Sequence, residues 1–294
     1  MSSKVKNSGK KNYGYLGPPG TFSEMAALKY TDSCDKIIPY KTIREVVEKV
    51  NKGEIKRGII PLENSQEGSV NVSLDLLLNK SNLKIIGEVI IPIEHYLMAP
   101  PDIKLKDIEE IYSHPQAIAQ SRDFIYQHLP EVNINFTDST ALAADKVVNN
   151  GKKAMIGSRR VNELYNLEIL AENVEGNLEN YTRFIVIALK EDKISFDNNL
   201  KNDDYKTSIV CTPQINRPGI LHEILGEFAN RSIDLTRIES RPTKKKLGEY
   251  LFYIDLEGKD ESAEISDALN KVKKKCRVFK ILGSYPQDKN RKET

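Results

Sequence analysis

The chain has 294 residues, enough for about two domains of ordinary size, each with a hydrophobic core. Its 44 Lys and Arg against 42 Asp and Glu give a formal net charge of +2, without the strongly basic field that is typical of nucleic-acid-binding proteins. The three cysteines are far apart and form no CxxC pair, which argues against a disulfide framework or a zinc site and favours a reducing, cytoplasmic location.

The first twelve residues, MSSKVKNSGKKN, are polar and basic, and they lack the apolar centre of a signal peptide. No run of about 18 apolar residues follows in the chain. We interpret residues 1–12 as a disordered tail, and we expect neither a membrane nor a nucleic acid as a partner.

From Tyr13 onward, short apolar runs alternate with helical patterns. YGYLG precedes SEMAALKY, KIIPY precedes TIREVVEKV, and RGIIPLEN precedes SVNVSLDLLL. This alternation predicts βαβ units around a parallel sheet. The segment 83–100, LKIIGEVIIPIEHYLMAP, is too long and too rich in β-branched residues for one strand, and we expect it to leave the first sheet.

A second series follows, with IEEIYSH before PQAIAQSRDFIYQHL, VNINF before TALAADKVV, and KKAMIG before SRRVNELYN. It predicts a second α/β lobe over about residues 89–175. The strand pattern NYTRFIVIALK then returns to the first lobe, which we place at about residues 13–88 and 176–190. We therefore expect an α/β fold of two lobes around a hinged cleft.

Residues 191–206 are polar and rich in Asn and Asp, which predicts a linker. Residues 207–286 then show the order strand, helix, strand, strand, helix, strand. This βαββαβ order is that of a ferredoxin-like domain. We interpret residues 287–294 as a second tail.

Ligands of open α/β sheets bind beyond the carboxyl ends of the strands, where the chain turns into helices. Taken singly, a polar residue at such a turn is better explained as a helix cap. Taken together, several helix N-termini that face one cleft form a site for an anion. The candidates at these turns are Thr21, Asn64, Ser65, Ser113, His114, Ser139 and Thr140.

Of the four histidines, only His114 lies where chemistry in the cleft is expected, and a structural role for its imidazole stays open. The chain has no GxGxxG, Walker, HExxH or GxSxG motif, so sites for dinucleotides, nucleoside triphosphates and zinc peptidases are not favoured. We expect no cofactor and no metal.

Five segments, GPPGTFSE, PLENSQEGSV, SHPQAIAQ, DSTALAA and GNLENYTRF, resemble the prephenate dehydratase family in order and spacing. The later stretch NRPGILHEILGEFANRSIDLTRIESRP resembles the ACT regulatory domain that is joined to that enzyme. The resemblance implies a periplasmic-binding-protein-like catalytic domain that converts prephenate to phenylpyruvate, with loss of water and carbon dioxide, in L-phenylalanine biosynthesis. No chorismate mutase segment precedes residue 13, so we expect a single activity.

The resemblance also implies roles for the motif Thr182-Arg183-Phe184. Thr182 is expected to assist the departing ring hydroxyl. Neighbouring side chains of a regular strand face opposite ways, so Arg183 either binds a substrate carboxylate or forms a structural ion pair, for instance with Glu63. Phe184 either contacts the substrate ring or packs in the core. The candidates at the turns are expected to bind the substrate.

In the C-terminal domain, the resemblance implies L-phenylalanine as an effector and a homodimer or homotetramer. Ile220 stands where the family commonly has alanine, and we expect it to narrow the effector pocket. A ligand sensor without activity and an arogenate dehydratase stay open as alternatives. The expected effector residues are Asn216, Pro218, Gly219, Ile220, Leu221, Glu239, Ser240, Arg241 and Pro242.

Overall fold

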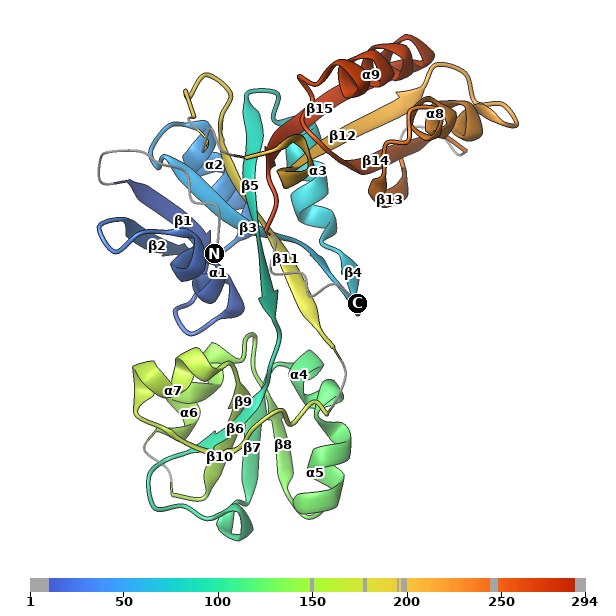
Figure 1. Ribbon diagram of the computed structural model, residues 1–294. Helices are drawn as coiled ribbons and strands as arrows, with labels where there is room; N and C mark the ends of the chain where they lie inside the picture. The colour runs from blue at the N-terminus through green and yellow to red at the C-terminus, as the bar shows by residue number, and fades with distance from the viewer. Residues whose placement is uncertain are drawn as a thin grey trace.

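The computed structural model describes residues 11–148, 151–176, 179–194, 196, 200–243 and 248–288. This part of the chain is organised by one sheet in each of two N-terminal lobes and one sheet in a C-terminal domain (Figure 1). Most of the two predicted tails, residues 1–10 and 289–294, lies outside the described residues.

The first lobe has a sheet of order β2-β1-β3-β11-β5, and a short strand, β4, pairs with β3. Strands β1 to β3 run parallel, whereas β11 is antiparallel to both of its neighbours. The strands are β1 (Asn12–Leu16), β2 (Lys36–Tyr40), β3 (Arg57–Asn64), β4 (Gly68–Ser69), β5 (Leu83–Pro92) and β11 (Tyr181–Leu189), and the helices are α1 (Phe22–Tyr30), α2 (Ile43–Asn51) and α3 (Asn71–Asn79).

The second lobe has a sheet of order β10-β6-β9-β7-β8, in which β7 runs parallel to β8 and β9. Its strands are β6 (Tyr96–Ala99), β7 (Glu110–Ser113), β8 (Asn133–Phe136), β9 (Lys153–Gly157) and β10 (Glu168–Ala171). Its helices are α4 (Pro115–Gln120), α5 (Arg122–His128), α6 (Ala144–Val147), α7 (Arg159–Tyr165) and the 3-10 turns η1 (Leu105–Asp107) and η2 (Ala141–Ala143).

Two segments connect the lobes. Strand β5 continues to Pro92, past the lobe boundary expected at residue 88, and the chain enters the second lobe through residues 93–95. The return path leads into β11, which lies between β3 and β5 at the centre of the first sheet. The first residues of β11 therefore lie where the first lobe faces the second (Figure 1).

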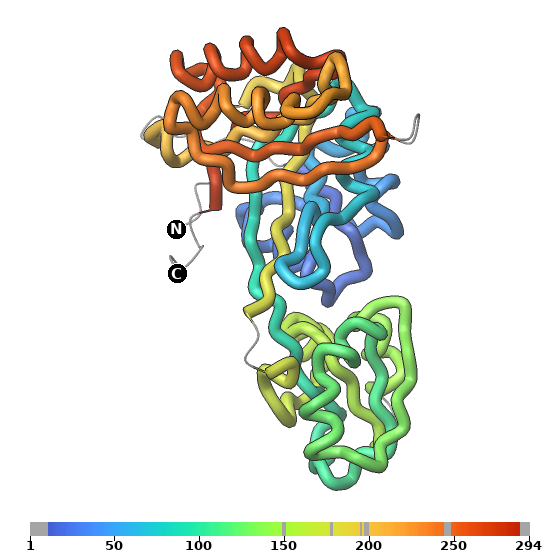
Figure 2. The backbone as a smooth tube through the Cα atoms, turned by 90° about the vertical axis from the view of Figure 1, so that its right-hand side faces the viewer, coloured from blue at the N-terminus to red at the C-terminus, as the bar shows by residue number. Residues whose placement is uncertain are grey.

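The C-terminal domain has the predicted βαββαβ order and an antiparallel sheet of order β13-β14-β12-β15. One face of this sheet packs on α8 and α9, and the other face packs on the first lobe (Figure 2). The elements are η3 (Asn202–Asp204), β12 (Tyr205–Pro213), α8 (Ile220–Ala229), β13 (Leu235–Pro242), β14 (Tyr250–Glu257), α9 (Ala263–Lys275) and β15 (Cys276–Pro286).

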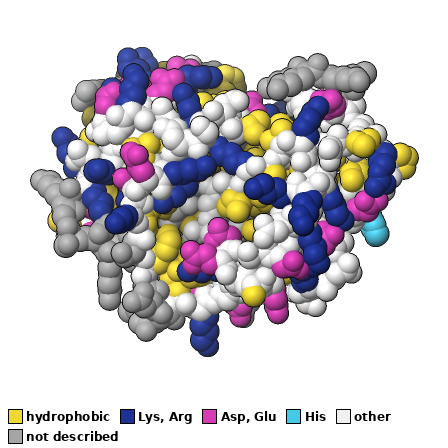
Figure 3. Space-filling view, turned by 90° about the horizontal axis from the view of Figure 1, so that it is seen from above, with side chains coloured by type: hydrophobic (Ala, Val, Ile, Leu, Met, Phe, Trp, Pro, Cys, Tyr) yellow, Lys and Arg dark blue, Asp and Glu magenta, His cyan; other side chains and the backbone are white. Residues whose placement is uncertain are grey.

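The surface seen from above the C-terminal domain carries basic and acidic side chains interspersed with one another (Figure 3). This mixture agrees with the small net charge of the sequence. Within the described ranges, no helix combines the length and the apolar composition that crossing a bilayer requires.

Candidate active site and effector pocket

A cleft of about 680 Å³ lies between the two lobes. Its walls are formed by the turns after β1 and β3 in the first lobe and by the turns after β7 and β8 in the second lobe. The predicted residues that line it are Thr21, Asn64, His114, Ser139, Thr140 and Thr182. The ends of strands from both lobes thus meet in one polar cavity.

Thr182 is held by Asn64, its register partner on β3. Asn64 Nδ2 donates to Thr182 Oγ1 at 2.9 Å and to Asn180 Oδ1 at 2.7 Å. Asn64 Oδ1 accepts from the backbone N–H groups of Gln66 and Glu67 at 2.9 and 3.0 Å, which defines the orientation of the amide. Because Thr182 Oγ1 already accepts a hydrogen bond, its own hydrogen is available for an acceptor in the cleft.

Several residues that line the cleft also cap helical segments. Thr21 Oγ1 accepts from the backbone N–H three residues further on, at 3.4 Å, at the start of α1. His114 Nδ1 accepts from the N–H two residues further on at 3.3 Å, and Ser139 Oγ accepts from the N–H three residues further on at 3.1 Å. The capping interpretation is confirmed for these residues, and their positions in the cleft wall leave them within reach of a ligand.

Arg183 points away from the cleft into a buried cluster of charges. Its Nε donates to Glu88 at 2.7 Å, its Nη1 to Asp255 at 2.6 Å and to Glu63 at 3.0 Å, and its Nη2 to the Tyr285 hydroxyl at 2.8 Å. Asp255 and Tyr285 belong to the C-terminal domain. The expectation that Arg183 binds a substrate carboxylate is therefore corrected, because the alternation of the strand directs it to the face opposite Thr182.

Two carboxylates beside Arg183, those of Glu88 and Asp255, stay ionised although they are buried. Burial would raise the pKa of Glu88, but the charges of Arg183 and Lys206 outweigh it and hold that pKa below its usual value. Burial also opposes ionisation of Asp255, whose pKa is nevertheless lowered by Arg183 and Arg237. The cluster is thus a set of paired charges at the contact between the first lobe and the C-terminal domain.

Three further predicted substrate ligands do not line the cleft. Phe184 is 2% exposed and packs in a core of the first lobe. Ser113 is buried, and its hydroxyl donates to the carbonyl of Ile156 at 2.7 Å. Ser65 Oγ accepts from the backbone N–H of Tyr181 at 3.0 Å. We correct Phe184 and Ser113 to structural roles, since both side chains are buried in the fold, whereas Ser65 is exposed and its contact with the substrate stays a prediction.

The cleft also has lining residues that sequence reasoning missed. Lys41 follows strand β2 and Ser69 is the last residue of β4, so the rule that ligands bind at strand ends could have identified them. His95 lies in the segment that connects the lobes, where no sequence signal marks a binding residue. The other lining residues with polar side chains that were not predicted to bind the substrate are Ser23, Glu67, Gln116, Gln120 and Asp138.

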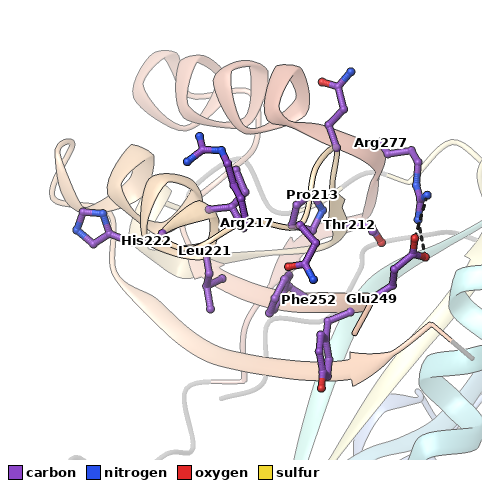
Figure 4. A pocket seen from close by; sticks show the side chains of 13 residues that line it. Thr212, Pro213, Arg217, Leu221, His222, Glu249, Phe252 and Arg277 are labelled. Carbon is purple, nitrogen blue, oxygen red and sulfur yellow. Dashed lines mark hydrogen bonds and ion pairs between the residues drawn. The ribbon is translucent and has the colours of Figure 1, made fainter. Parts of the chain in front are cut away.

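A second cavity of about 340 Å³ lies in the C-terminal domain beside the start of α8. The predicted effector residues Asn216, Gly219, Ile220 and Leu221 line it. Gly219 has a φ of 82°, a left-handed conformation that favours glycine. Figure 4 shows the ion pair of Arg277 with Glu249 at one side of the cavity, with the closest atoms 3.0 Å apart. The cavity therefore combines charged groups with apolar side chains.

The other predicted effector residues, Pro218 and residues 239–242, do not line this cavity. Arg241 Nη1 instead donates to Asp75 Oδ1 at 2.9 Å, and Glu239 contacts Ser69. Both partners belong to the first lobe. Within one chain, the segment 239–242 therefore contacts the lobe that carries Thr182, and its part in effector binding stays a prediction.

The fold and its two cavities define a class of protein: an α/β protein with a polar cleft between two lobes and a ferredoxin-like domain with its own small-molecule pocket. The model of the prephenate dehydratase family matches residues 13–192, and that of the ACT domain matches residues 214–274. The chain belongs to the prephenate dehydratase family and carries an ACT domain. It is a carbon–oxygen lyase that converts prephenate to phenylpyruvate.

Prephenate dehydratase from Methanocaldococcus jannaschii is 42% identical over 277 residues, which cover 92% of this chain and 97% of the relative. The solved structure of prephenate dehydratase from Arthrobacter aurescens in complex with L-Phe is 33% identical, with a TM-score of 0.84, and the match covers 96% of this chain and 92% of that one. A solved structure described as a novel type of quorum quenching acylase is 27% identical, with a TM-score of 0.85 and coverages of 96% and 100%. The predicted family and fold are confirmed.

Proposed function

We propose that prephenate binds in the cleft between the lobes and that Thr182 assists the departure of its ring hydroxyl. One observation carries this proposal: Asn64 Nδ2 donates to Thr182 Oγ1 at 2.9 Å inside the cleft. This bond orients the threonine so that its hydroxyl hydrogen is available to a leaving group.

The reaction breaks two bonds of the prephenate ring. The C–C bond to the ring carboxylate breaks, and its electron pair enters the ring while carbon dioxide leaves. The C–O bond at the opposite ring carbon breaks, and the hydroxyl leaves with the bonding pair and takes up a proton to become water. Because the ring becomes aromatic, the enzyme needs chiefly to stabilise the leaving hydroxide in the transition state.

Threonine is a weak acid, so its contribution is that of a hydrogen-bond donor. A hydrogen bond to a charged group is worth about 1.5–3 kcal/mol, which corresponds to a rate factor of roughly 10 to 150. A positioned general acid typically gives about 10² to 10⁴. The remaining acceleration comes from holding the dianion in a closed cleft, where donors fixed in advance act at low dielectric.

The two carboxylates of prephenate have suitable partners in the cleft wall. Lys41 supplies a cation from the first lobe. The start of α1, at Thr21, supplies backbone N–H groups and the positive end of a helix dipole, and His114 supplies an imidazole from the second lobe. Because these groups belong to different lobes, a bound dianion would hold the lobes together.

The test is formation of phenylpyruvate from prephenate by the purified protein, measured by its absorbance in alkali. Thr182→Val keeps the shape of the side chain but removes the hydroxyl, and we expect kcat to fall between about 10- and 150-fold. Thr182→Ser should keep most of the activity. A Thr182→Val enzyme with normal kcat would contradict the assigned role.

The same assay separates the remaining substrate alternatives. Arogenate, run in parallel, has an amino group in place of the ketone of prephenate, and faster turnover of arogenate would identify it as the preferred substrate. The alternative of a ligand sensor without activity is not supported, since the chain belongs to a family of lyases.

We further propose L-phenylalanine as an effector that binds in the ACT cavity. The start of α8 and the guanidinium of Arg217 suit its carboxylate, Glu249 suits its ammonium group, and Ile220 and Phe252 suit its ring. Phenylalanine should then inhibit turnover in a saturable manner. Gly219→Leu, which cannot easily adopt the left-handed conformation, should abolish this response.

A homodimer or homotetramer and a cytoplasmic location are also proposals. Exposed apolar side chains near the ACT cavity support assembly, since Ile215 is 65% exposed and Tyr250 is 46% exposed. Sedimentation with and without phenylalanine tests this, and a monomer under both conditions would refute it. The free thiols of Cys34, Cys211 and Cys276 support a reducing compartment.

A further inference from the structure

We propose that Arg237, on β13 of the ACT domain, is a positioning residue for the catalytic cleft of its own chain. The proposal rests on the function proposed above for the cleft. In this interpretation the ACT domain does more than bind an effector, because it also supports one wall of the substrate site.

Arg237 contacts both the wall of the cleft and the strand behind it. Its Nη2 donates to Ser69 Oγ at 2.6 Å, and its Nε pairs with Glu63 Oε2 at 2.7 Å. Its Nη2 also pairs with Glu239, which in turn accepts a hydrogen bond from Ser69. Ser69 lines the cleft, so two ACT side chains determine the direction of its hydroxyl.

Glu63 extends this contact to the catalytic pair. Its Oε2 binds Arg237, and its Oε1 accepts from Arg183 Nη1 at 3.0 Å. Glu63 and Arg183 are register partners on β3 and β11, and the next pair in the ladder is Asn64 with Thr182. One face of this ladder therefore carries an ion pair that Arg237 completes, and the opposite face carries the hydrogen bond that orients the catalytic hydroxyl.

The burial of Arg237 makes this arrangement sensitive to substitution. Its side chain is only 8% exposed, so its positive charge is compensated by these partners rather than by water. A neutral side chain would leave the carboxylates of Glu63 and Glu239 without their shared cation. We expect the end of β3 and the short strand β4 to shift in response, and Asn64 with them.

The same strands connect the cleft to the ACT cavity. Tyr250 and Phe252 of β14 line the cavity, while Asp255 of β14 accepts a hydrogen bond from Arg183 at 2.6 Å. Strand β13, with Arg237, pairs directly with β14. A shift of β14 on effector binding would therefore reach the ladder that carries Thr182 through these two strands.

The experiment compares Arg237→Gln with Lys280→Gln. Lys280 also joins the ACT domain to the first lobe, because its Nζ donates to the carbonyls of Leu77 and Lys80 at the end of α3, at 2.5 and 2.8 Å. It does not line the cleft. We expect Arg237→Gln to lower kcat for prephenate about tenfold, with Lys280→Gln within about twofold of the wild type.

Two further readouts make the result decisive. Arg237→Lys should recover part of the lost kcat, because an ammonium can pair with one carboxylate but cannot form the forked contact. Amide hydrogen exchange over residues 64–69 should be faster in Arg237→Gln than in Lys280→Gln. Normal kcat in Arg237→Gln, or equal losses and equal exchange in both variants, would overturn the proposal. If the wild-type enzyme formed no phenylpyruvate, the proposed function would fail, and the exchange comparison would still decide the role of Arg237.

Discussion

Thr182 and Arg183 are neighbours in the chain, but their side chains act on opposite faces of one sheet. Thr182 accepts from Asn64 in the cleft, while Arg183 pairs with Glu63 and with Asp255 of the ACT domain. The period of two in a strand produces this division. Substitutions at the two positions should therefore act by different routes: those at Thr182 remove the hydroxyl in the cleft, and those at Arg183 act through the contact between domains and the end of β3.

The buried side chain of His95 predicts that the stability of the protein depends on pH. It is 3% exposed, and its Nε2 lies 3.0 Å from Gln120 Oε1. The amide nitrogen of Gln120 donates to Gln66, so Oε1 is the acceptor and His95 Nε2 carries the hydrogen. Burial lowers the pKa of His95 from 6.5 to about 4, and the bond to Gln120 only partly opposes this. The folded protein thus holds His95 neutral.

The sign of the effect follows from the two pKa values. Because the unfolded chain binds this proton first, stability is full above about pH 6.5 and is lost as the pH falls toward 4. The loss from this one group is about 3 kcal/mol. In His95→Gln, the free energy of unfolding should fall less over this pH range than in the wild type. Urea titrations at several pH values measure the difference, and parallel curves for the two proteins would refute the prediction.

The candidate site could be predicted only where its signals are local. Thr21, Asn64, His114, Ser139 and Thr140 lie at or after the ends of strands, and the strand-end rule placed them in the cleft wall. Strand alternation left open an ion pair of Arg183 with Glu63, and the structure has this pair. The further contacts of Arg183 could not be derived from its neighbours in sequence, because Asp255 and Tyr285 approach it only after the ACT domain packs on the first lobe. The contact between Arg237 and Ser69 could not be predicted for the same reason, because the two residues are far apart in the sequence.

At the scale of elements, the lobes contact each other on two sides of the cleft. On one side, Gln120 of α4 donates to Gln66, in the turn between β3 and β4, at 3.0 Å. On the other side, Ser158 donates to the carbonyl of Gly20 at 2.7 Å, and Arg160 of α7 pairs with Glu24 of α1. These contacts favour the closed arrangement in which water is excluded from the reaction.

Ser158→Ala tests whether these contacts support catalysis. Ser158 is fully buried, and its loss leaves the carbonyl of Gly20 without this donor. The hydrogen bond is worth about 1 kcal/mol, so we expect kcat/KM for prephenate to fall about fivefold as the closed population decreases. Ser73→Ala is the matched control, because Ser73 is equally buried and donates to the carbonyl of Pro61 within one lobe. Equal kinetic effects of both substitutions would show that the contact between lobes is not responsible.

The helices and strands were predicted well from the periodicity of apolar residues, but the residues at which they begin and end were not. Alternating apolar runs and helical patterns indicated two α/β lobes and a βαββαβ domain, and the structure has them. The boundary expected at residue 88 fell within β5, which continues to Pro92 because its last residues still pair with β11. Pairing with a strand about 90 residues away is a tertiary interaction that composition cannot reveal.

At the scale of the whole molecule, the ACT domain and the first lobe share one core. Val210, Tyr253 and Leu282 of the ACT sheet pack in the same cluster as Leu74 and Ile85 of the first lobe. Burial of these side chains in a common core predicts that the two parts unfold together rather than as independent units. It also explains why both faces of the ACT sheet are apolar.

At Gly283, the backbone of β15 lies close to the backbone of β5 in this shared core. A Cβ at this position would lie 2.2 Å from the carbonyl oxygen and 2.9 Å from the carbonyl carbon of Ile85, so the backbone of β5 would have to move. We expect Gly283→Ala to lower the free energy of unfolding by about 1–3 kcal/mol or more, as overpacking of a core does. If this substitution separates the ACT domain from the first lobe, calorimetry should resolve two unfolding transitions in place of one. Gly226→Ala, in helix α8 with no atom within 4 Å of the added carbon, should instead be neutral or stabilising. Equal thermal stability of the two variants would show that the close packing of β15 on β5 does not stabilise the contact between the ACT domain and the first lobe.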